Sequence, residues 1–446
     1  MTATKIIVLD DDPTGSQTVH GCLLLTRWDV PTLTEALADD APLFFVLTNT
    51  RGMPAVRAAE ITREVCRNLK AALSGQDLHP IFVSRSDSTL RGHYPIETDV
   101  MAEELGPFDA HFLVPAFFEG GRITRDSVHY LRSEGREIPV HETEFARDSV
   151  FGYRHSYLPD YVEEKTRGRI RAASVQRLRL DDVRNGVYLR LMTFSDNVCV
   201  VVDAENQTDL DHFAADIRRA AGEGKRFLFR SAASLLTSLA KLPPQPVAAE
   251  QMAAIARDGR PGAVLIGSHV AKTTRQLAKL LEAPGTVAIE VDVRRLPQER
   301  DQLLAEVLAR ADVAHRAGQT PVVYTSRVER SFSDQGARLA FGEAVSAFLM
   351  DVVRGLPPTL GFLISKGGIT SNDVLSAGLA LRTARLLGQI LPGVSVVRCP
   401  PDHVRYPDMP VVIFPGNVGD DAALATVYRR LGGAAAGARS ASRLSR

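Results

Sequence analysis

Residues 5–15 of the chain read KIIVLDDDPTG, an apolar run that ends in three aspartates, a proline, a threonine and a glycine. Such a run predicts a buried strand, and the polar residues after it predict the turn where that strand ends. Similar short apolar runs recur along the chain, most of them continuous rather than alternating, and longer amphipathic stretches follow many of them. Continuous runs are typical of a mainly parallel sheet that helices cover on both faces. The sequence therefore predicts an α/β fold.

The expected elements follow from this pattern of runs. Strands are expected at residues 5–9, 43–47, 81–83, 111–114, 198–202, 226–229, 263–266, 287–290, 321–324, 361–364, 394–397 and 411–414. The clearest helical spacing of apolar residues lies at residues 55–72, 299–317, 338–353 and 372–387. This alternation predicts right-handed crossovers between parallel strands. Residues 119–186 are polar, rich in Arg and Tyr and without a clear strand period, so we expect an insertion there that serves a subunit contact or a substrate pocket.

The chain is long enough for two domains. Its 446 residues exceed the roughly 250–300 at which a single hydrophobic core stops growing, and the Pro- and Ala-rich stretch at residues 241–262 holds no expected strand. We therefore expect two three-layer domains, at residues 1–242 and 263–431, with residues 243–262 as the linker and a cleft between the domains. The Gly-, Ala- and Ser-rich residues 432–446 are expected to be disordered.

Composition narrows the class of protein. The chain carries 53 basic and 53 acidic side chains, and this neutral total gives no reason to expect a nucleic acid or a membrane surface as a partner. Its four cysteines are far apart, which argues against a zinc site. We expect no signal peptide, and the sequence contains no apolar run of about 18 residues. We expect a cytoplasmic enzyme that acts on a small molecule; its oligomeric state is left open, with a homodimer as one option.

The first candidate site is the triplet Asp10, Asp11 and Asp12. In an open α/β sheet ligands bind at the carboxyl ends of the strands, and three adjacent carboxylates repel one another unless a cation, a substrate hydroxyl or helix N–H groups receive them. One of these carboxylates is therefore expected to bind a ligand or to act as a base. The alternative is a structural turn in which an aspartate caps the next helix.

A second candidate is the loop at residues 84–92, SRSDSTLRG, which follows another expected strand. Arg85 and Arg91 suit a carboxylate, because a guanidinium group binds it through two parallel hydrogen bonds. The serines and the aspartate between them suit the hydroxyl groups of a polyol. Arg51 follows a third expected strand and would lie on the same sheet edge. These are the groups that a small acidic sugar requires, and the alternative is a solvated strand-to-helix loop.

Three glycine-bearing loops follow expected strands in the second half. Residues 365–372 read SKGGITSN, and paired glycines let the backbone approach a phosphate at the N-terminus of the following helix. Gly267-Ser268-His269 and the segment from Pro415 to Asp420 follow two other strands. Together the loops predict one nucleotide site, although each alone is compatible with a tight turn that binds nothing. The chain has neither a Walker loop nor a Gly-x-Gly-x-x-Gly after a strand, which disfavours a nicotinamide enzyme.

Two other functions stay open. Asp10 and Asp12 fit the opening pattern of haloacid-dehalogenase-like phosphatases, in which they would serve as nucleophile and as acid/base. Leu47-Thr48 and the segment from Gly419 to Asp421 would then be later motifs, but the last of them falls in the other expected domain. The second alternative is a sugar-acid-binding protein without catalysis.

The separated loops occur in the order found in the four-carbon acid sugar kinase family, which the chain resembles over nearly its whole length. The segments that carry the resemblance are Asp11 to Gly15, Asp87 to Gly92, Gly267-Ser268, Gly367 to Thr370 and Pro415 to Gly419. The resemblance implies a first domain that binds a sugar acid and a second that binds ATP. It also implies a kinase that phosphorylates a hydroxyl of a small four-carbon or branched sugar acid, 3-oxo forms included, with Mg²⁺ carried by the nucleotide.

The resemblance further implies roles for individual residues. Contacts to the nucleotide are expected from Ser268, Gly367, Gly368, Ile369, Thr370 and Gly416. Contacts to the sugar acid are expected from Asp12, Arg51, Asp87, Ser88 and Arg91. We hypothesise that Asp12 or Asp11 deprotonates the attacking hydroxyl while Arg85 or Arg91 holds the carboxylate. Three positions depart from the family pattern: Arg85, Val270 and Ile369. These departures leave the identity of the substrate undecided.

Overall fold

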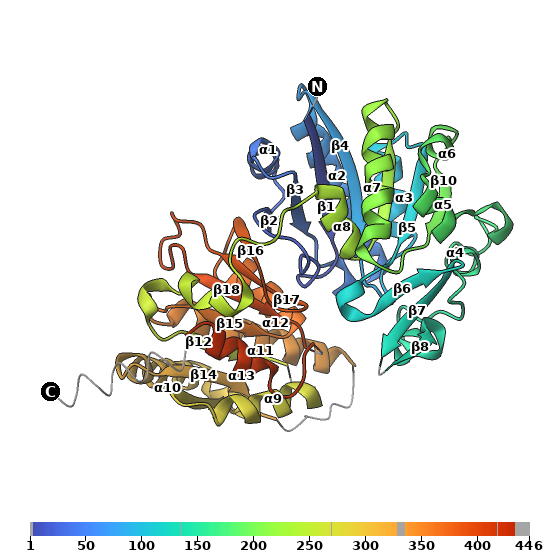
Figure 1. Ribbon diagram of the computed structural model, residues 1–446. Coiled ribbons are helices and arrows are strands. Elements are labelled where there is room, and N and C mark those ends of the chain that lie inside the picture. Colours follow the sequence, from blue (N-terminus) through green and yellow to red (C-terminus); the bar gives the residue numbers. More distant parts are fainter. Residues whose placement is uncertain (1–2, 134, 269, 328–334, 417, 433–446) are drawn as a thin grey trace. The chain divides into compact units, whose positions relative to one another are not determined.

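The computed structural model describes residues 3–133, 135–268, 270–327, 335–416 and 418–432. The chain divides into two compact units, Met1–Pro244 and Gln245–Arg446. Each unit contains strands and helices in alternation, with a mostly parallel arrangement of strands (Figure 1). The predicted α/β class is therefore confirmed. Disorder was expected for residues 432–446, and residues 433–446 of that range lie outside the described residues.

The sheet of the first unit has the order β2-β3-β1-β4-β11-β5-β10-β9, and all its pairings are parallel. Its strands are β1 (Ala3–Asp10), β2 (Leu23–Leu25), β3 (Leu43–Leu47), β4 (Leu78–Arg85), β5 (Ala110–Val114), β9 (Gln176–Leu178), β10 (Val198–Val202) and β11 (Phe227–Ser231). The helices are α1 (Val30–Ala38), α2 (Ala55–Leu73), α3 (Ile96–Leu105), α4 (Leu158–Lys165), α5 (Leu180–Asn185), α6 (Tyr188–Met192), α7 (Gln207–Gly222) and α8 (Ser234–Ala240).

Helices cover both faces of this sheet, which explains its continuous apolar strands. On one face, Ile7 of β1 and Phe82 of β4 belong to the same buried cluster as Leu69 of α2. On the other face, Phe112 of β5 stacks on Phe229 of β11, with 5.2 Å between ring centroids, and meets Phe213 of α7 edge-on at 5.4 Å. Burying both faces stabilises the sheet through the hydrophobic effect and fixes where each strand ends.

A small antiparallel sheet, β6-β7-β8, lies inside the segment for which we expected no strands. Its strands are β6 (Arg122–Arg125), β7 (Val128–Ser133) and β8 (Arg136–Pro139). Backbone bridges from Phe117 to Arg122 and from Thr124 to Ala204 join it to the segments that follow β5 and β10. These strands are short and half-exposed, so they leave no apolar run that a sequence pattern could reveal.

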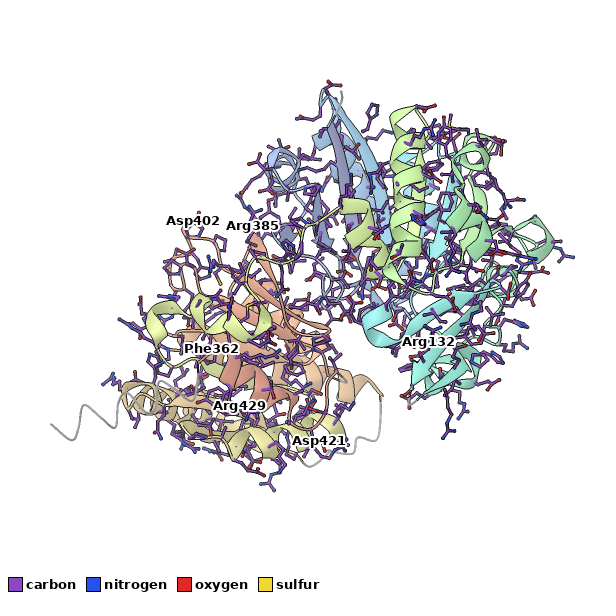
Figure 2. All side chains as sticks on the ribbon, viewed as in Figure 1. Arg132, Phe362, Arg385, Asp402, Asp421 and Arg429 are labelled. Atoms are coloured by element: carbon purple, nitrogen blue, oxygen red, sulfur yellow. The ribbon has the colours of Figure 1, made fainter. Side chains whose placement is uncertain are left out.

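The second unit has the strand order β13-β14-β12-β15-β18-β17-β16, parallel up to β18 and antiparallel beyond it. Its strands are β12 (Ala263–Ile266), β13 (Thr286–Val291), β14 (Thr320–Thr325), β15 (Leu363–Lys366), β16 (Thr383–Leu391), β17 (Val394–Arg398) and β18 (Pro410–Phe414). The helices are α9 (Ala271–Leu281), α10 (Leu296–Arg316), α11 (Gln335–Gly355), α12 (Gly368–Asp373) and α13 (Ala423–Arg430). Phe362, labelled in Figure 2, is buried in the core of this unit.

The prediction of a helix at residues 372–387 is wrong. Helix α12 ends at Asp373, a short π-helical turn follows at Val374–Gly378, and Ala380 adopts a left-handed φ of 50° that stops any continuation. The chain then forms β16, whose burial alternates along the strand because it pairs antiparallel with β17 at the end of the sheet.

Among the helices that the structure describes, none is both long enough and apolar enough to span a membrane.

Candidate functional site

The register of the first sheet brings the polar loops after β1, β3 and β4 to one edge. Asp10 is aligned with Leu47 on one side and with Arg85 on the other, so the three strands end at the same level. The backbone N–H and the hydroxyl of Thr48 both donate to the Asp10 carbonyl at 2.9 Å. This alignment places the aspartate triplet, Arg51 and the loop at residues 84–92 in one cluster.

Asp10 is fully buried and paired with a buried arginine. Its Oδ1 accepts a hydrogen bond of 3.1 Å from Nη1 of Arg85, while its Oδ2 has no hydrogen-bond partner among the described residues. A Cβ atom at Gly15 would lie 2.1 Å from this Oδ2, so only glycine fits against the carboxylate. Burial, together with the charges of Asp11 and Asp12, raises the pKa of Asp10 to about 7, although Arg85 opposes the rise. Asp10 is thus enclosed by the protein.

Asp11 is bound by side chains from the two neighbouring loops. Arg51 donates to both of its oxygens, from Nη2 to Oδ1 and from Nε to Oδ2, the latter at 3.2 Å. The Ser86 hydroxyl lies 2.7 Å from the same Oδ2. Arg230 of β11 donates in turn to the hydroxyl groups of Ser84 and Ser86, both at 2.7 Å. The carboxylate of Asp11 is therefore engaged by the protein and serves to hold Arg51 in place.

Asp12 differs from its neighbours because part of its side chain, 22%, is exposed. Its Oδ1 accepts hydrogen bonds from the backbone N–H and the hydroxyl of Thr14, at 2.8 and 2.5 Å, and its Oδ2 lies 3.4 Å from Nη1 of Arg51. Burial acts to raise the pKa of Asp12, but the charges of Arg51 and Arg85 and the Thr14 hydrogen bonds outweigh it and lower that pKa. Asp12 is the ionised and accessible carboxylate of the triplet.

The loop from Asp87 to Gly92 is closed by its own charged pair. Asp87 accepts a hydrogen bond of 2.7 Å from Nε of Arg91 and another from the Thr89 hydroxyl. Burial opposes ionisation, but Arg51 and Arg91 hold the pKa of Asp87 well below its usual range. Gly92 has a φ of +122°, and a Cβ there would lie 2.5 Å from the Ser86 hydroxyl. A side chain at this position would disrupt both the backbone and the polar network.

Three aromatic residues of the 119–186 segment hold the same loop from outside. Nε2 of His129 contacts the Ser88 carbonyl at 2.7 Å, and the hydroxyl groups of Tyr153 and Tyr161 donate to the carbonyls of Thr89 and Leu90 at 2.7 and 2.9 Å. Burial raises the pKa of both tyrosines and lowers that of His129 to about 4, so all three are neutral at physiological pH. Sequence reasoning missed these residues, since nothing in an irregular polar segment shows which loop it contacts.

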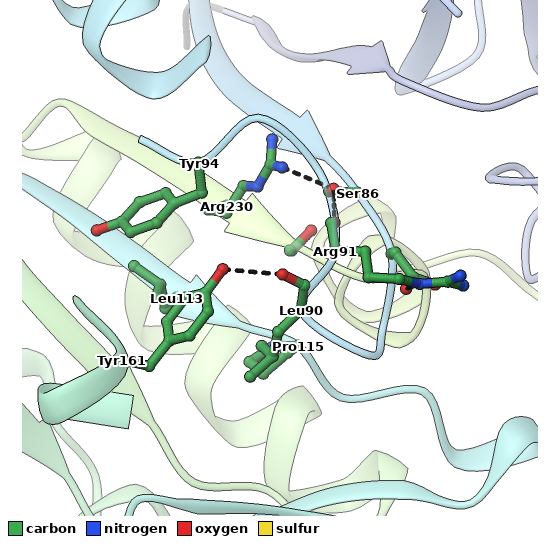
Figure 3. Close-up of a pocket in the computed structure, with 10 residues that line it drawn as sticks. Ser86, Leu90, Arg91, Tyr94, Leu113, Pro115, Tyr161 and Arg230 are labelled. Carbon is green, nitrogen blue, oxygen red and sulfur yellow. Dashed lines mark hydrogen bonds and ion pairs between the residues drawn. The ribbon is translucent and has the colours of Figure 1, made fainter. Parts of the chain in front are cut away.

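A small hollow that is partly open to solvent lies behind the loop (Figure 3). Figure 3 shows Tyr94 and Tyr161 on one side of it, whereas Arg91 extends away from both. The guanidinium group of Arg91 lies 5.0 Å from the ring centroid of Phe145. The residues that line the hollow are Ser86, Asp87, Leu90, Arg91, Tyr94, Leu113, Pro115, Tyr161, Arg230 and Ser231.

The predicted glycine loops of the second unit also come together, at the ends of β12, β15 and β18. A Cβ at Gly267 would lie 2.3 Å from the Thr370 hydroxyl, and Gly367 has a φ of +118°. The Thr273 hydroxyl lies 3.4 Å from that of Ser268 and 3.3 Å from the Gly416 carbonyl. Gly368 and Ile369 begin α12 in the same loop, and the Ile369 side chain is 72% exposed. His269 and Asn417 lie outside the described residues.

Lys366, which sequence reasoning did not single out, is buried at the base of these loops. Its ammonium group donates to the carbonyls of Pro415 and Gly416, the latter at 3.2 Å, and lies 3.9 Å from the ring centroid of Phe414. Burial, aided by the charge of Lys272, lowers the pKa of Lys366 to about 7. The signal that could have revealed it is a lysine directly before a glycine pair at a strand end.

Models of two protein domains match this chain. A sugar-binding N-terminal domain matches residues 6–239, and a nucleotide-binding C-terminal domain matches residues 263–424. The chain is 25% identical to the D-erythronate kinase of Heliobacterium modesticaldum over 415 residues, covering 87% of this chain and 89% of the relative. It is 27% identical to the D-threonate kinase of Cupriavidus necator over 373 residues, covering 80% of this chain and 81% of the relative.

Solved structures show the same fold. A crystal structure from Salmonella typhimurium LT2 matches with a TM-score of 0.72 at 20% identity, covering 96% of this chain and 99% of that one. A crystal structure of a Haemophilus influenzae protein matches with a TM-score of 0.64 at 16% identity, covering 95% and 100%. These likenesses concern the fold alone.

A sugar-binding domain followed by a nucleotide-binding domain defines a class of two-domain carbohydrate kinases. Within that class, the chain belongs to the four-carbon acid sugar kinase family. The resemblance seen in the sequence is thereby confirmed, and so is the predicted type of enzyme, a phosphotransferase with an alcohol group as acceptor.

Proposed function

We propose that this enzyme transfers the γ-phosphoryl group of ATP to a hydroxyl of a four-carbon polyhydroxy acid, with Asp12 as the general base. The observation that carries the proposal is the contrast within the aspartate triplet. Asp10 is buried and Asp11 is engaged by Arg51 and Ser86, whereas Asp12 is ionised and partly exposed. A base for a hydroxyl group needs both of these properties.

The groups around Asp12 suit a small sugar acid. Arg51 connects Asp11 and Asp12 and also acts electrostatically on Asp87 of the neighbouring loop. Arg91 is fixed through Nε by Asp87, and its outer nitrogens face Asp148 only at 3.9 Å. We assign the substrate carboxylate to Arg91, because the guanidinium of Arg85 is buried against Asp10. Asp87 and Ser88 remain the proposed partners of the substrate hydroxyls.

The glycine loops of the second unit suit the phosphates of ATP. Gly416 is partly exposed, Gly367 gives the loop a φ of +118°, Ser268 and Thr370 supply hydroxyl groups, and Lys366 supplies a positive charge. No described carboxylate lies within ion-pair distance of Lys366, so a phosphate would be its anionic partner. The described residues hold no group of three or more His, Cys, Asp or Glu that could bind a metal ion. In this proposal Mg²⁺ arrives with the nucleotide, where it would neutralise phosphate charge.

The reaction follows from these positions. The carboxylate of Asp12 accepts the proton of the acceptor hydroxyl as its oxygen forms a bond to the γ-phosphorus, while the bond from that phosphorus to the β–γ bridging oxygen breaks and ADP leaves. Arg51 keeps Asp12 ionised before the transfer, because its charge stabilises the carboxylate rather than the acid. The rest of the catalytic effect comes from positioning and from neutralising charge on the transferred group.

The phosphatase alternative requires Asp10 to attack a phosphate ester. Its carboxylate is 0% exposed, is paired with Arg85 and lies against Gly15. A nucleophile must reach its substrate, so this environment argues against the alternative. Asp420 and Asp421, proposed for the acidic motif of such an enzyme, lie in the second unit, where Asp421 pairs with Arg275 at 2.9 Å.

A coupled ADP-release screen tests the proposal. The panel contains D-erythronate, D-threonate, their enantiomers, the 3-oxo acids and branched relatives, and mass spectrometry checks for the phosphorylated acid. We expect ADP release that depends strictly on one of these acids. Phosphate release from phosphate esters without nucleotide would favour the phosphatase, and acid binding without nucleotide affinity would favour a binding protein. Silence across the panel from folded protein would contradict the proposal.

A further inference from the structure

Arg122 begins the small sheet next to the proposed sugar-acid site. Two backbone hydrogen bonds fix Arg122 to Phe117. The Arg122 N–H donates to the Phe117 carbonyl at 2.8 Å, and the Phe117 N–H donates to the Arg122 carbonyl at 3.0 Å. Phe117 follows β5, whose carboxyl end contributes Leu113 and Pro115 to the hollow. The position of Arg122 is therefore set by the main sheet, although the residue belongs to the inserted segment.

Arg122 is partly buried, and its guanidinium group has no ionic partner among the described residues. Its Nη1 donates to the Gly120 carbonyl, and its buried Nε has no hydrogen-bond partner among the described residues. A Cβ at Gly120 would lie 2.2 Å from this Nη1, so the glycine leaves the space that the guanidinium occupies. No carboxylate of the described segments lies within ion-pair distance of it. Such a cation is costly to bury unless an anion joins it.

Arg122 shares its surroundings with Arg91. The two guanidinium carbons lie 5.9 and 5.0 Å from the ring centroid of the same residue, Phe145. Asp87 attracts Arg122 electrostatically and Arg91 repels it, so Asp87 and Arg91 both lie close enough to Arg122 to interact with its charge. Asp87 already accepts hydrogen bonds from Arg91 and Thr89, and Asp148 is the acid that lies 3.9 Å from Arg91. Neither acid is hydrogen-bonded to Arg122, and Asp87 acts on it only electrostatically.

We propose that Arg122 is a second guanidinium for the carboxylate of the sugar acid, and that the small sheet thereby makes the enzyme select acids over neutral polyols. The proposal rests on the function proposed above. The carboxylate binds between Arg91 and Arg122, beside the Phe145 ring that supports both, and its negative charge supplies the partner that Arg122 lacks. Truncation of Arg122 therefore weakens binding of the acid and leaves binding of the corresponding alditol unchanged.

The test compares Arg122→Met and Arg122→Lys with Arg132→Met in the full-length protein. Arg132 is a matched control because it lies on β7 of the same sheet, is 42% exposed and pairs with Glu137 (Figure 2). Calorimetry measures binding of the preferred acid and of erythritol or threitol without nucleotide, and steady-state kinetics gives KM for the acid and for ATP. Circular dichroism checks that each variant is folded.

We expect Arg122→Met to raise the KM for the acid and the Kd of the acid about 10- to 100-fold. The KM for ATP should stay within twofold, and the lysine variant should recover part of the loss. Wild-type acid affinity in folded Arg122→Met would overturn the inference, and so would an equal loss in Arg132→Met. A rise confined to the KM for ATP would assign Arg122 to a phosphate instead. Failure of the wild-type protein to bind or phosphorylate any acid would instead remove the proposed function itself.

Discussion

The two clusters of polar residues in this enzyme handle charge in opposite ways. In the first unit, the aspartate triplet meets Arg51 and Arg85 in a dense network where nearly every charge has a partner. In the second unit, Lys366 contacts two backbone carbonyls and the Phe414 ring, and no described carboxylate lies within ion-pair distance of it. Under the proposed function, the first arrangement sets the protonation state of the base in advance, whereas the second leaves a positive charge for a phosphate to neutralise. A kinase needs both arrangements of charge, one for each of its two substrates.

The largest effect is expected when the proposed base, Asp12, is replaced. Asp12→Asn keeps the shape and the Thr14 hydrogen bonds but cannot accept a proton, so kcat should fall at least about 100-fold. The KM for ATP should change little. Steady-state kinetics with the preferred acid measures both values, and Asp77→Asn, in an exposed loop after α2, serves as the control. Near-normal turnover in folded Asp12→Asn would remove Asp12 from this role.

The close packing of the first cluster leads to the second prediction. In Gly92→Ala the new methyl group meets the Ser86 hydroxyl and Arg230, and the backbone adopts a φ that alanine disfavours. We expect a loss of at least about 2 kcal/mol in the free energy of unfolding of the first unit. Urea denaturation measures it.

Gly52→Ala is the control for that experiment, because a Cβ at Gly52 meets nothing within 4 Å and its φ is not positive. Its stability should stay within about 0.5 kcal/mol of wild type. Equal stability of the Gly92 and Gly52 variants would show that the network tolerates more movement than its distances indicate.

The strand ends of both clusters could be predicted from the sequence, and the partners of the loops could not. Continuous apolar runs mark parallel strands, and polar residues directly after them must lie at the carboxyl edge, which is why Asp12, Arg91 and Gly367 were found. His129 and Tyr161 contact the loop through a segment whose path depends on long-range packing. No local periodicity records such contacts.

The wrong helix at residues 372–387 has a related cause. Its apolar residues recur at helical spacing, yet Ala380 breaks the helix and the rest pairs with β17. Pairing with a strand later in the chain overrides local spacing, because β16 pairs with β17 across two register shifts and buries alternate side chains. Arg230 directly follows the strand expected at residues 226–229 but was not singled out, because that strand extends to Ser231 and nothing in the sequence shows that the arginine contacts Ser84 and Ser86.

The unpaired cation of the second unit predicts a pH dependence of stability. Lys366 has a pKa of about 7 in the folded protein against 10.5 as its ordinary value. Between these values the unfolded chain binds more protons, so the free energy of unfolding of this unit should rise with pH from 7 towards 10. Lys366→Met should remove that rise, whereas Lys279→Met, an exposed residue of α9 paired with Glu282, should keep it. Urea denaturation at pH 7.5 and 9.5 measures the slope, and equal slopes in all three proteins would contradict a buried ammonium group.

The smallest effect is expected from the hydrogen bonds that hold the first loop from outside. Tyr161→Phe removes the donor to the Leu90 carbonyl but keeps the aromatic ring, so the free energy of unfolding should fall by about 1 kcal/mol. Because Leu90 has a left-handed φ of 66° within the loop proposed to bind the acid, losing this hydrogen bond should raise the KM for the acid a few-fold and leave the KM for ATP unchanged. Tyr188→Phe, whose exposed hydroxyl donates to Glu223, is the control and should alter neither constant. If Tyr161→Phe changed kcat or the KM for ATP instead, the inserted segment would affect more than the acid-binding loop, and the assignment of the two clusters to separate substrates would need revision.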